Sequence, residues 1–326
     1  GGAGISTAAL IFGGRTPPNS TSDVTEKFDG SSWTTSPATL GTAAKQSAAF
    51  GTKTAAVYAG NDPAANITQE YNSSATVITA ASWSSGGSLN SARRGSCSGG
   101  DKTAAYYAGG IESSASAKTE TYDGTSFSEV NNMGTARYGI DTNMGTLTAG
   151  LTAGGKGGGT VYGNTEEWDG TNWSEQTDMS SARRYLGGFG TQTAGVVFGG
   201  RTAPNAKVAT TEEYNGSSWT SGGDMNTVRE YAAGCGTLTA GLTLAGAPGA
   251  ITDVEYYNGT AWSEQSAAFP GQRDLFGISG TQTNALIFGG GTPSNTATAF
   301  SYDGTAFATS PSMGTARQAM GSPGPA

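Results

Sequence analysis

The segment TEEYNGSSWTSGG, residues 211–223, contains an order of residues that returns along the whole chain. An aromatic residue precedes Asn or Asp, a small residue follows, usually Gly, and then a second aromatic residue, usually Trp. The seven copies are anchored at Asp29, Asn72, Asp123, Asp169, Asn215, Asn258 and Asp303, with spacings of 43, 51, 46, 46, 43 and 45 residues. This period is typical of a β-propeller, in which each repeat is one four-stranded blade that buries its faces only against its neighbours.

The repeat therefore predicts an all-β fold, a seven-bladed propeller that occupies residues 1–326 as a single domain. The composition agrees, because 53 Gly in 326 residues without a Gly-X-Y period indicates many tight turns. Length alone favours about two domains. The unbroken repeat overrides that estimate.

Residues 183–229 show how one repeat forms one blade. YLGGFG predicts a small innermost strand, TAGVVFGG a second strand buried on both faces, ATTEEY a third, and Trp219 lies on the fourth. Asn215-Gly216 predicts a two-residue type I′ hairpin, which needs positive φ at both positions. The flanking aromatic residues, Tyr214 and Trp219, are then expected to pack between blades.

The order strand–Gly-Gly, Glu-x-aromatic-Asp/Asn, Trp and Arg resembles the kelch repeat, in all seven copies. The pair Gly-Gly is replaced by Gly60-Asn61 and Ala245-Gly246 in two repeats, and the turn before the Trp is shorter than in kelch. The sequence pattern GTQTA…FGG…TEEYNGSSW is also similar to repeats of structural and tail-associated proteins of marine bacteriophages. That resemblance implies a viral structural protein, a tail fibre or an adhesion module.

The ends of the chain predict how the ring closes. Residues 4–14, GISTAALIFGG, align with GTQTAGVVFGG, which leaves repeat one apparently short of its first strand. Residues 313–322, MGTARQAMGS, align with MSSARRYLGG. We therefore expect the C-terminal segment to supply the first strand of blade one and to remove an open sheet edge.

Several functions have little support in the composition. The net charge of −8 does not indicate a basic surface that binds nucleic acid. No apolar run approaches the roughly 18 residues of a membrane-spanning helix. The chain has no His, which removes the commonest general base and metal ligand. The copper chemistry of galactose oxidase, a kelch enzyme, depends on histidines. We expect no enzyme, cofactor or metal, and no disulfide between Cys97 and Cys235.

An Arg recurs at one position of the repeat, and two interpretations of it stay open. The members are Arg93, Arg137, Arg183, Arg229, Arg273 and Arg317, while repeat one has Ala44. Such a ring could engage carboxylates or phosphates of a ligand. Alternatively, each Arg neutralises one of the recurring Glu residues within the propeller. These are Glu26, Glu120, Glu166, Glu212 and Glu255.

The connections after the second strands differ in length and sequence, whereas the other turns are uniform. Strand alternation puts them on the side of the propeller that bears the repeated Arg positions, which we call the variable-loop face. Its candidate ligand-binding residues, beside the six Arg, are Arg15, Asn19, Asn61, Arg201, Asn205 and Asn295. Loops on rigid scaffolds carry recognition, which makes this face the binding candidate; the alternative is neutral drift of loops in solvent.

These observations predict a noncatalytic recognition or structural propeller, displayed on a virion or extracellular appendage. Its expected partner is a glycan or protein on a cell surface, or another subunit of the same assembly. The alternative is a carbohydrate-active enzyme, a glycosidase or lyase, that works with carboxylates alone. Asp23, Asp62, Glu112 and Asp253 are the acids that its loops offer.

Overall fold

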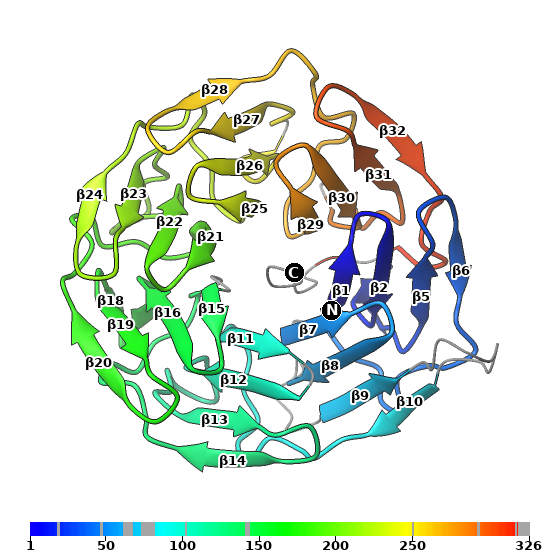
Figure 1. Ribbon diagram of the computed structural model, residues 1–326, viewed down its shortest axis with the longest axis horizontal. Helices are drawn as coiled ribbons and strands as arrows, with labels where there is room; N and C mark the ends of the chain where they lie inside the picture. The colour runs from blue at the N-terminus through cyan, green and yellow to red at the C-terminus, as the bar shows by residue number, and fades with distance from the viewer. Residues whose placement is uncertain are drawn as a thin grey trace.

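The chain folds into a ring of seven four-stranded antiparallel sheets, which confirms the predicted all-β, seven-bladed propeller (Figure 1). The computed structural model describes residues 1–17, 20–45, 48–60, 68–72, 82–101, 103–140, 144–249, 251–291, 294–316 and 318. These residues contain strands and no helix. In every blade the four strands follow one another outward from the central axis in chain order.

The first strand of each blade is the innermost, and the fourth is the outermost. Blades one to three contain β1 (Gly2–Ile5), β2 (Ala8–Phe12), β5 (Thr25–Phe28) and β6 (Trp33–Thr35); β7 (Ala48–Thr52), β8 (Ala55–Ala59), β9 (Thr68–Asn72) and β10 (Ser82–Ser85); and β11 (Cys97–Asp101), β12 (Ala104–Ala108), β13 (Thr119–Tyr122) and β14 (Phe127–Val130). Blades four and five contain β15 (Met144–Thr146), β16 (Ala149–Ala153), β19 (Thr165–Trp168) and β20 (Trp173–Gln176); and β21 (Gly187–Thr191), β22 (Ala194–Phe198), β23 (Thr211–Tyr214) and β24 (Trp219–Ser221). Blades six and seven contain β25 (Ala233–Thr237), β26 (Ala240–Leu244), β27 (Val254–Tyr257) and β28 (Trp262–Glu264); and β29 (Gly277–Thr281), β30 (Asn284–Phe288), β31 (Ala299–Tyr302) and β32 (Phe307–Ser310).

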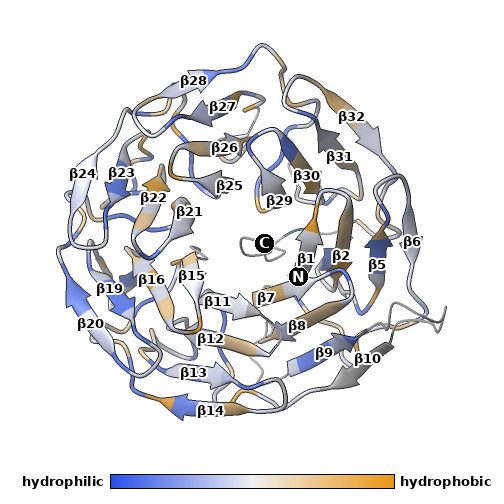
Figure 2. Cartoon of the chain, viewed as in Figure 1, coloured by the Kyte–Doolittle hydropathy of each residue, from blue (hydrophilic) through white to orange (hydrophobic). Residues whose placement is uncertain are grey.

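Hydrophobic burial is concentrated in the second strand of each blade. In β22, Gly195, Val196, Val197 and Phe198 are buried, because blades four and six cover the two faces of blade five. The outermost strands are largely hydrophilic, as Figure 2 shows for β20. The innermost strands approach the neighbouring blade closely: a Cβ at Gly234, in β25 of blade six, would lie 2.8 Å from the Phe198 ring of blade five. Small residues there are therefore required by packing.

The turn in the quoted segment differs from the predicted type I′ hairpin. Tyr214 pairs with Trp219, so four residues form the loop, and Gly216 has a φ of 91° whereas Asn215 is not left-handed. The Asn215 side chain instead accepts hydrogen bonds from the backbone N–H groups of Ser217 and Ser218, both at 3.0 Å. Asp and Asn recur at this position because their Oδ1 atom closes the turn, an Asx-type interaction.

The Trp after this turn connects its blade to the preceding one. Indole Nε1 atoms donate to the Thr that begins the third strand of the preceding blade, at 2.7 Å in each case: Trp173 to Thr119, Trp219 to Thr165 and Trp262 to Thr211. The predicted packing of aromatic residues between blades thus includes a specific polar bond. Between blades seven and one the Thr is replaced by Ala299, and the buried Nε1 of Trp33 has no hydrogen-bond partner among the described residues.

The prediction about ring closure is wrong in its choice of strand. Gly2 to Ile5 form the innermost strand of blade one and pair with Ala8 to Ile11. Residues 1–7, GGAGIST, are the counterpart of GGFGTQT at 187–193, so repeat one contains its own first strand. The segment 319–326 lies outside the described residues.

Blades seven and one meet through ordinary inter-blade packing. β1 lies beside β29, and the Ser279 hydroxyl donates to the Gly4 carbonyl. Met313 is buried in one cluster with Phe28 of blade one and Phe288 of blade seven. Covering the edge of blade one therefore needs no strand from the C-terminal segment.

Candidate functional site

The variable-loop face is built from two sets of connections that pair with each other. In blades three to seven the segment that enters the blade forms an antiparallel bridge with the connection that follows the second strand of the same blade. These bridges join Arg94 to Ile111, Tyr138 to Lys156, Arg184 to Arg201, Glu230 to Ala247 and Asp274 to Gly291. The expectation that the varied connections and the repeated Arg positions share a face is therefore correct.

Two connections also form short ribbons, β3 (Arg15–Thr16) with β4 (Ser20–Thr21) and β17 (Lys156–Gly157) with β18 (Thr160–Val161). In blade five, Arg201 forms a single bridge with Lys207 at the same place. Backbone pairing thus fixes the base of the connection, and the residues between the paired positions differ from blade to blade. This is the arrangement of a rigid scaffold with a variable surface.

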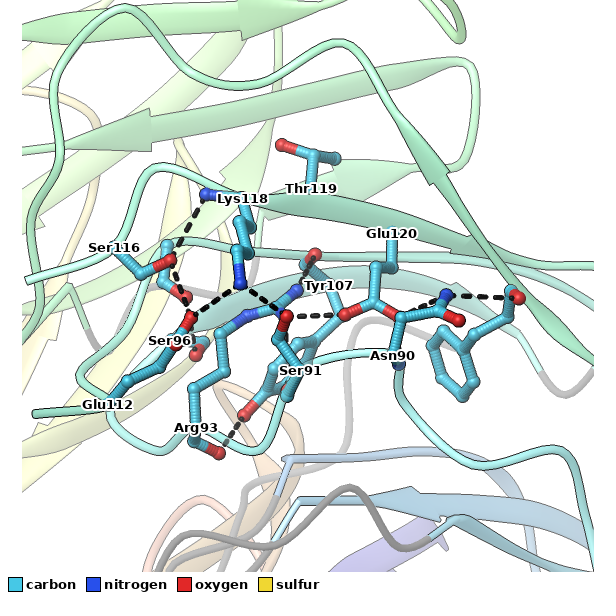
Figure 3. A network of polar contacts seen from close by, with 12 residues as sticks. Asn90, Ser91, Arg93, Ser96, Tyr107, Glu112, Ser116, Lys118, Thr119 and Glu120 are labelled. Carbon is cyan, nitrogen blue, oxygen red and sulfur yellow. Dashed lines mark hydrogen bonds and ion pairs between the residues drawn. The ribbon is translucent and has the colours of Figure 1, made fainter.

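Four members of the predicted Arg ring form buried ion pairs with the Glu of the next blade. The pairs are Arg93–Glu120, Arg137–Glu166, Arg183–Glu212 and Arg229–Glu255. All eight side chains are at most 3% exposed. Figure 3 shows the first pair, with Asn90 donating from both its backbone and its side chain to the second oxygen of Glu120. The structure therefore favours the structural interpretation of these Arg residues over direct contact with a ligand.

The Arg183 guanidinium illustrates how such a buried pair is satisfied. Its Nη2 atom donates to Glu212 at 2.7 Å, and Nη1 donates to the carbonyls of Gly199 and Thr210 at 3.1 and 2.6 Å. The second oxygen of Glu212 accepts from the backbone N–H of Ser180 at 2.6 Å. Burial lowers the pKa of Arg183 and the Glu212 carboxylate opposes that shift. The pair is a bonded junction between blades.

Two blade junctions depart from this pattern in an informative way. Ala44 replaces Arg between blades one and two, and there Gln69 replaces Glu while still accepting from the Gly41 N–H at 2.6 Å. Arg273 meets Phe300 in place of Glu, and its guanidinium lies over the Phe300 and Phe269 rings at 5.2 and 4.9 Å. Burial lowers the pKa of Arg273 to about 10. Arg317 lies outside the described residues.

The other predicted site residues take different places on the variable-loop face. Arg15 is half-buried and its backbone carbonyl accepts from the Asn295 side chain. Asn205 is exposed and accepts from Arg184 at 2.8 Å, while Arg201 pairs with Glu230. Asn19 and Asn61 lie outside the described residues. The structure thus brings Arg201 and Asn205 together on one connection, and places Arg15 and Asn295 at the junction of blades seven and one.

A polar and aromatic cluster lies at the entrance to blades five and six, and of its members only Arg201 was predicted from the sequence. It consists of Arg184, Tyr185, Arg201, Lys207, Glu230 and Tyr231, and we call it the entrance cluster. Arg201 and Lys207 both contact Glu230, the latter at 3.5 Å. The rings of Tyr185 and Tyr231 lie 4.6 Å apart between centroids. Four of the members directly follow a repeated Arg: Arg184 and Tyr185 in SARRY, and Glu230 and Tyr231 in TVREY. Aligning the two positions after each repeated Arg would have shown them.

The acids that the enzyme alternative requires are Asp23, Asp62, Glu112 and Asp253, and of these Asp23 is exposed on the connection after β4. Glu112 pairs with Lys118 at 3.2 Å (Figure 3), and Asp253 accepts from the Thr227 hydroxyl at 2.5 Å. Asp62 lies outside the described residues. Within the described ranges no three His, Cys, Asp or Glu side chains come together as metal ligands.

The two cysteines are buried free thiols, which agrees with the expectation that they form no disulfide. Burial raises the pKa of Cys97 to about 11 and that of Cys235 to about 12. Both thiols are therefore protonated at neutral pH, and neither is an activated nucleophile. In the part of the chain that the structure describes, no helix has the length and apolarity to cross a membrane.

Comparison with known proteins gives a likeness of fold. No protein-family model matches the chain, and no curated protein matches it. Among solved structures, that of YjhT superposes with a TM-score of 0.63 at 10% sequence identity, over 82% of this chain and 97% of YjhT. At that identity the likeness shows the propeller architecture alone.

Proposed function

We propose that the chain is a noncatalytic recognition propeller that binds a glycan or a protein through its variable-loop face. One observation carries the proposal: the connections on this face differ in every blade, whereas the turns on the opposite face repeat with the same contacts. The glycine of each Asp-Gly or Asn-Gly turn packs on a Thr of the neighbouring turn, as Gly170 does on Thr148 and Gly216 on Thr193. Varied loops held by a uniform scaffold are where binding residues are disproportionately found.

The charge of the variable-loop face supports the same proposal. Two positions per blade line its inner edge: the residue after the repeated Arg and the residue after the second strand's glycine pair. Among the described residues the cations at these positions are Lys45, Arg94, Arg184, Arg15, Lys156 and Arg201, and the acids are Glu230 and Asp274; the acid of repeat two, Asp62, lies outside the described residues. An excess of cations here, in a chain of net charge −8, indicates a face suited to an anionic or polar partner.

Display on a virion or an extracellular appendage forms part of the proposal. It rests on the similarity of the repeat sequence to repeats of phage structural proteins. A ring of blades leaves only short, protected sheet edges, which suits such exposure. The partner is then a glycan or protein on a cell surface, or a neighbouring subunit of the same assembly.

A glycan array with two matched loop exchanges tests the proposal. In the first variant, residues 202–206 of blade five are replaced by GGGT, which is the connection at 157–160 of blade four. In the second, the NGSS turn at 215–218 on the opposite face is replaced by the DGTN turn of 169–172. We expect the first exchange to weaken binding and the second to leave it unchanged. Binding lost only with the second exchange would contradict the choice of face.

The enzyme alternative is tested on the same samples with a panel of glycosidase and lyase substrates. We expect no turnover, because Glu112 and Asp253 are bonded to neighbours and the chain has no His. Hydrolysis that a single acid-to-amide substitution abolishes would instead establish the enzyme.

A further inference from the structure

Tyr185 and Tyr231 hold a left-handed backbone conformation at a position that is glycine in blades three and four and Leu275 in blade seven. Their φ angles are 55° and 52°, in the left-handed region, and the equivalent residues Gly95 and Gly139 have φ of 68° and 66°. A non-glycine residue costs free energy in that region, of order 1 kcal/mol or more. Two blades therefore carry a bulky aromatic residue where the backbone favours glycine.

The two tyrosines form consecutive steps around the inner edge of the variable-loop face. The backbone N–H of Tyr185 donates to the Gly139 carbonyl, and that of Tyr231 donates to the Tyr185 carbonyl, both at 3.1 Å. The Tyr185 ring packs where a Cβ of Gly139 would stand, and the Tyr231 ring packs on the Tyr185 ring at a tilt of 34°. Both side chains remain partly exposed. The strained backbone thus presents a fixed pair of aromatic rings next to the central axis.

Cations outnumber acids beside these rings. Arg184 lies 5.6 Å from the centre of the Tyr185 ring, is only 8% exposed, and its Nε atom has no hydrogen-bond partner within the described protein. The Arg201 and Lys207 side chains are 26% and 27% exposed and contact Glu230, the acid of the cluster. Three cations against one carboxylate leave the entrance cluster with a local excess of two positive charges.

From this arrangement we infer that the entrance cluster binds a carboxylate-bearing sugar of an acidic polysaccharide. The planar guanidinium groups match a carboxylate, and partly exposed aromatic rings offer apolar contact to the C–H groups of a sugar ring. Arg184 and Arg201 are the residues assigned to the carboxylate, and Tyr185 and Tyr231 to the sugar ring. The inference rests on the proposed recognition function and adds the class of ligand and its position.

The test uses polygalacturonate as the probe, with its carboxyl-reduced neutral form and dextran sulfate as comparisons. The variant Tyr185→Gly restores the residue found at positions 95 and 139, so it keeps the backbone conformation and removes only the ring. The variant Arg184→Gln removes one charge, and Lys53→Gln, in the β7–β8 turn on the opposite face, is its control for net charge. Affinities are measured by calorimetry on the full chain, with melting temperatures as a check on folding.

We expect wild type to bind polygalacturonate and not the neutral form, with about tenfold weaker binding in Tyr185→Gly and in Arg184→Gln. The affinity of Lys53→Gln should equal that of wild type, and the melting temperature of Tyr185→Gly should not fall, because relief of the left-handed strain opposes the loss of the ring contacts. Equal affinity for dextran sulfate would overturn the assignment to carboxylate, and polygalacturonate binding that survives both cluster substitutions, or its absence in wild type, would overturn the site. Glycan-array binding that the blade-five loop exchange abolishes and Tyr185→Gly leaves intact would retain the proposed function and reject this inference alone.

Discussion

Replacing Arg183 by Ala is the sharpest test of how the blades are held together. Its guanidinium is fully buried and donates to Glu212, Gly199 and Thr210 across the junction of blades four and five. The substitution leaves the Glu212 carboxylate buried with the Ser180 N–H as its remaining hydrogen-bond donor on the same junction. Breaking a buried pair in this way costs about 3–5 kcal/mol.

That free energy corresponds to a measurable fall in melting temperature. An unfolding entropy of about 2.1 cal/mol/K per residue gives roughly 0.7 kcal/mol/K for a chain of 326 residues, so the expected fall is about 4–7 °C. Tryptophan fluorescence or calorimetry reports it. Part of the loss should be regained at mildly acidic pH, because an unpaired buried carboxylate takes up a proton rather than remain charged.

The chain supplies its own control for this experiment in the Ala44–Gln69 junction. The double variant Arg183→Ala/Glu212→Gln copies that junction, where the Gln69 side chain still accepts from a backbone N–H at 2.6 Å. We expect the double variant to be clearly more stable than Arg183→Ala, since no buried charge is left unpaired. A double variant no more stable than the single one, or a melting temperature of Arg183→Ala equal to wild type, would refute the ion-pair interpretation.

Three further predictions concern the repeated contacts. Ala299→Thr should stabilise the chain by about 1–3 kcal/mol, because it gives the buried Trp33 Nε1 the hydroxyl acceptor that other junctions have. Denaturant unfolding measures the gain. The control Ala299→Val adds the same bulk without the hydroxyl and should not match it. Phe127→Trp should likewise stabilise the junction of blades two and three, because its indole donates to the Thr68 hydroxyl, which has no partner among the described residues. The control Phe307→Trp should give no such gain, because Val254 holds the Thr position of the preceding blade. Hydrogen bonds from the turn lower the pKa of Asp123 to about 2, and they also lower the pKa of Asp29, Asp169 and Asp303. The stabilisation that these ionised carboxylates contribute is present above about pH 4 and is lost as the pH falls toward 2. Acid unfolding of a variant with Asn at all four positions should therefore begin at lower pH than that of wild type, and an unshifted acid transition would contradict this prediction.

The repeat period was enough to predict the number of blades. A blade cannot bury its own faces, so seven copies of one unit have few alternatives to a closed ring. The position of each Asp or Asn turn was also readable, but the mechanism was not, since only the backbone shows that Asn215 keeps negative φ and closes the turn with its side chain. The first strand of blade one was present in the sequence as GGAGIST and was missed because the alignment of this repeat began at Gly4, which left residues 1–3 without their counterpart at 187–189.

The sequence by itself determined the repeating contacts of this protein, because each depends on a residue type that recurs at a fixed position within the repeat. Tertiary structure alone decided which partners meet, since Arg183 bonds with the Glu of the following repeat and Trp219 with the Thr of the preceding one. It also decided where the candidate site lies. Tyr185 and Tyr231 stand in separate repeats, and ring closure stacks them because neighbouring blades bring equivalent positions together around the axis.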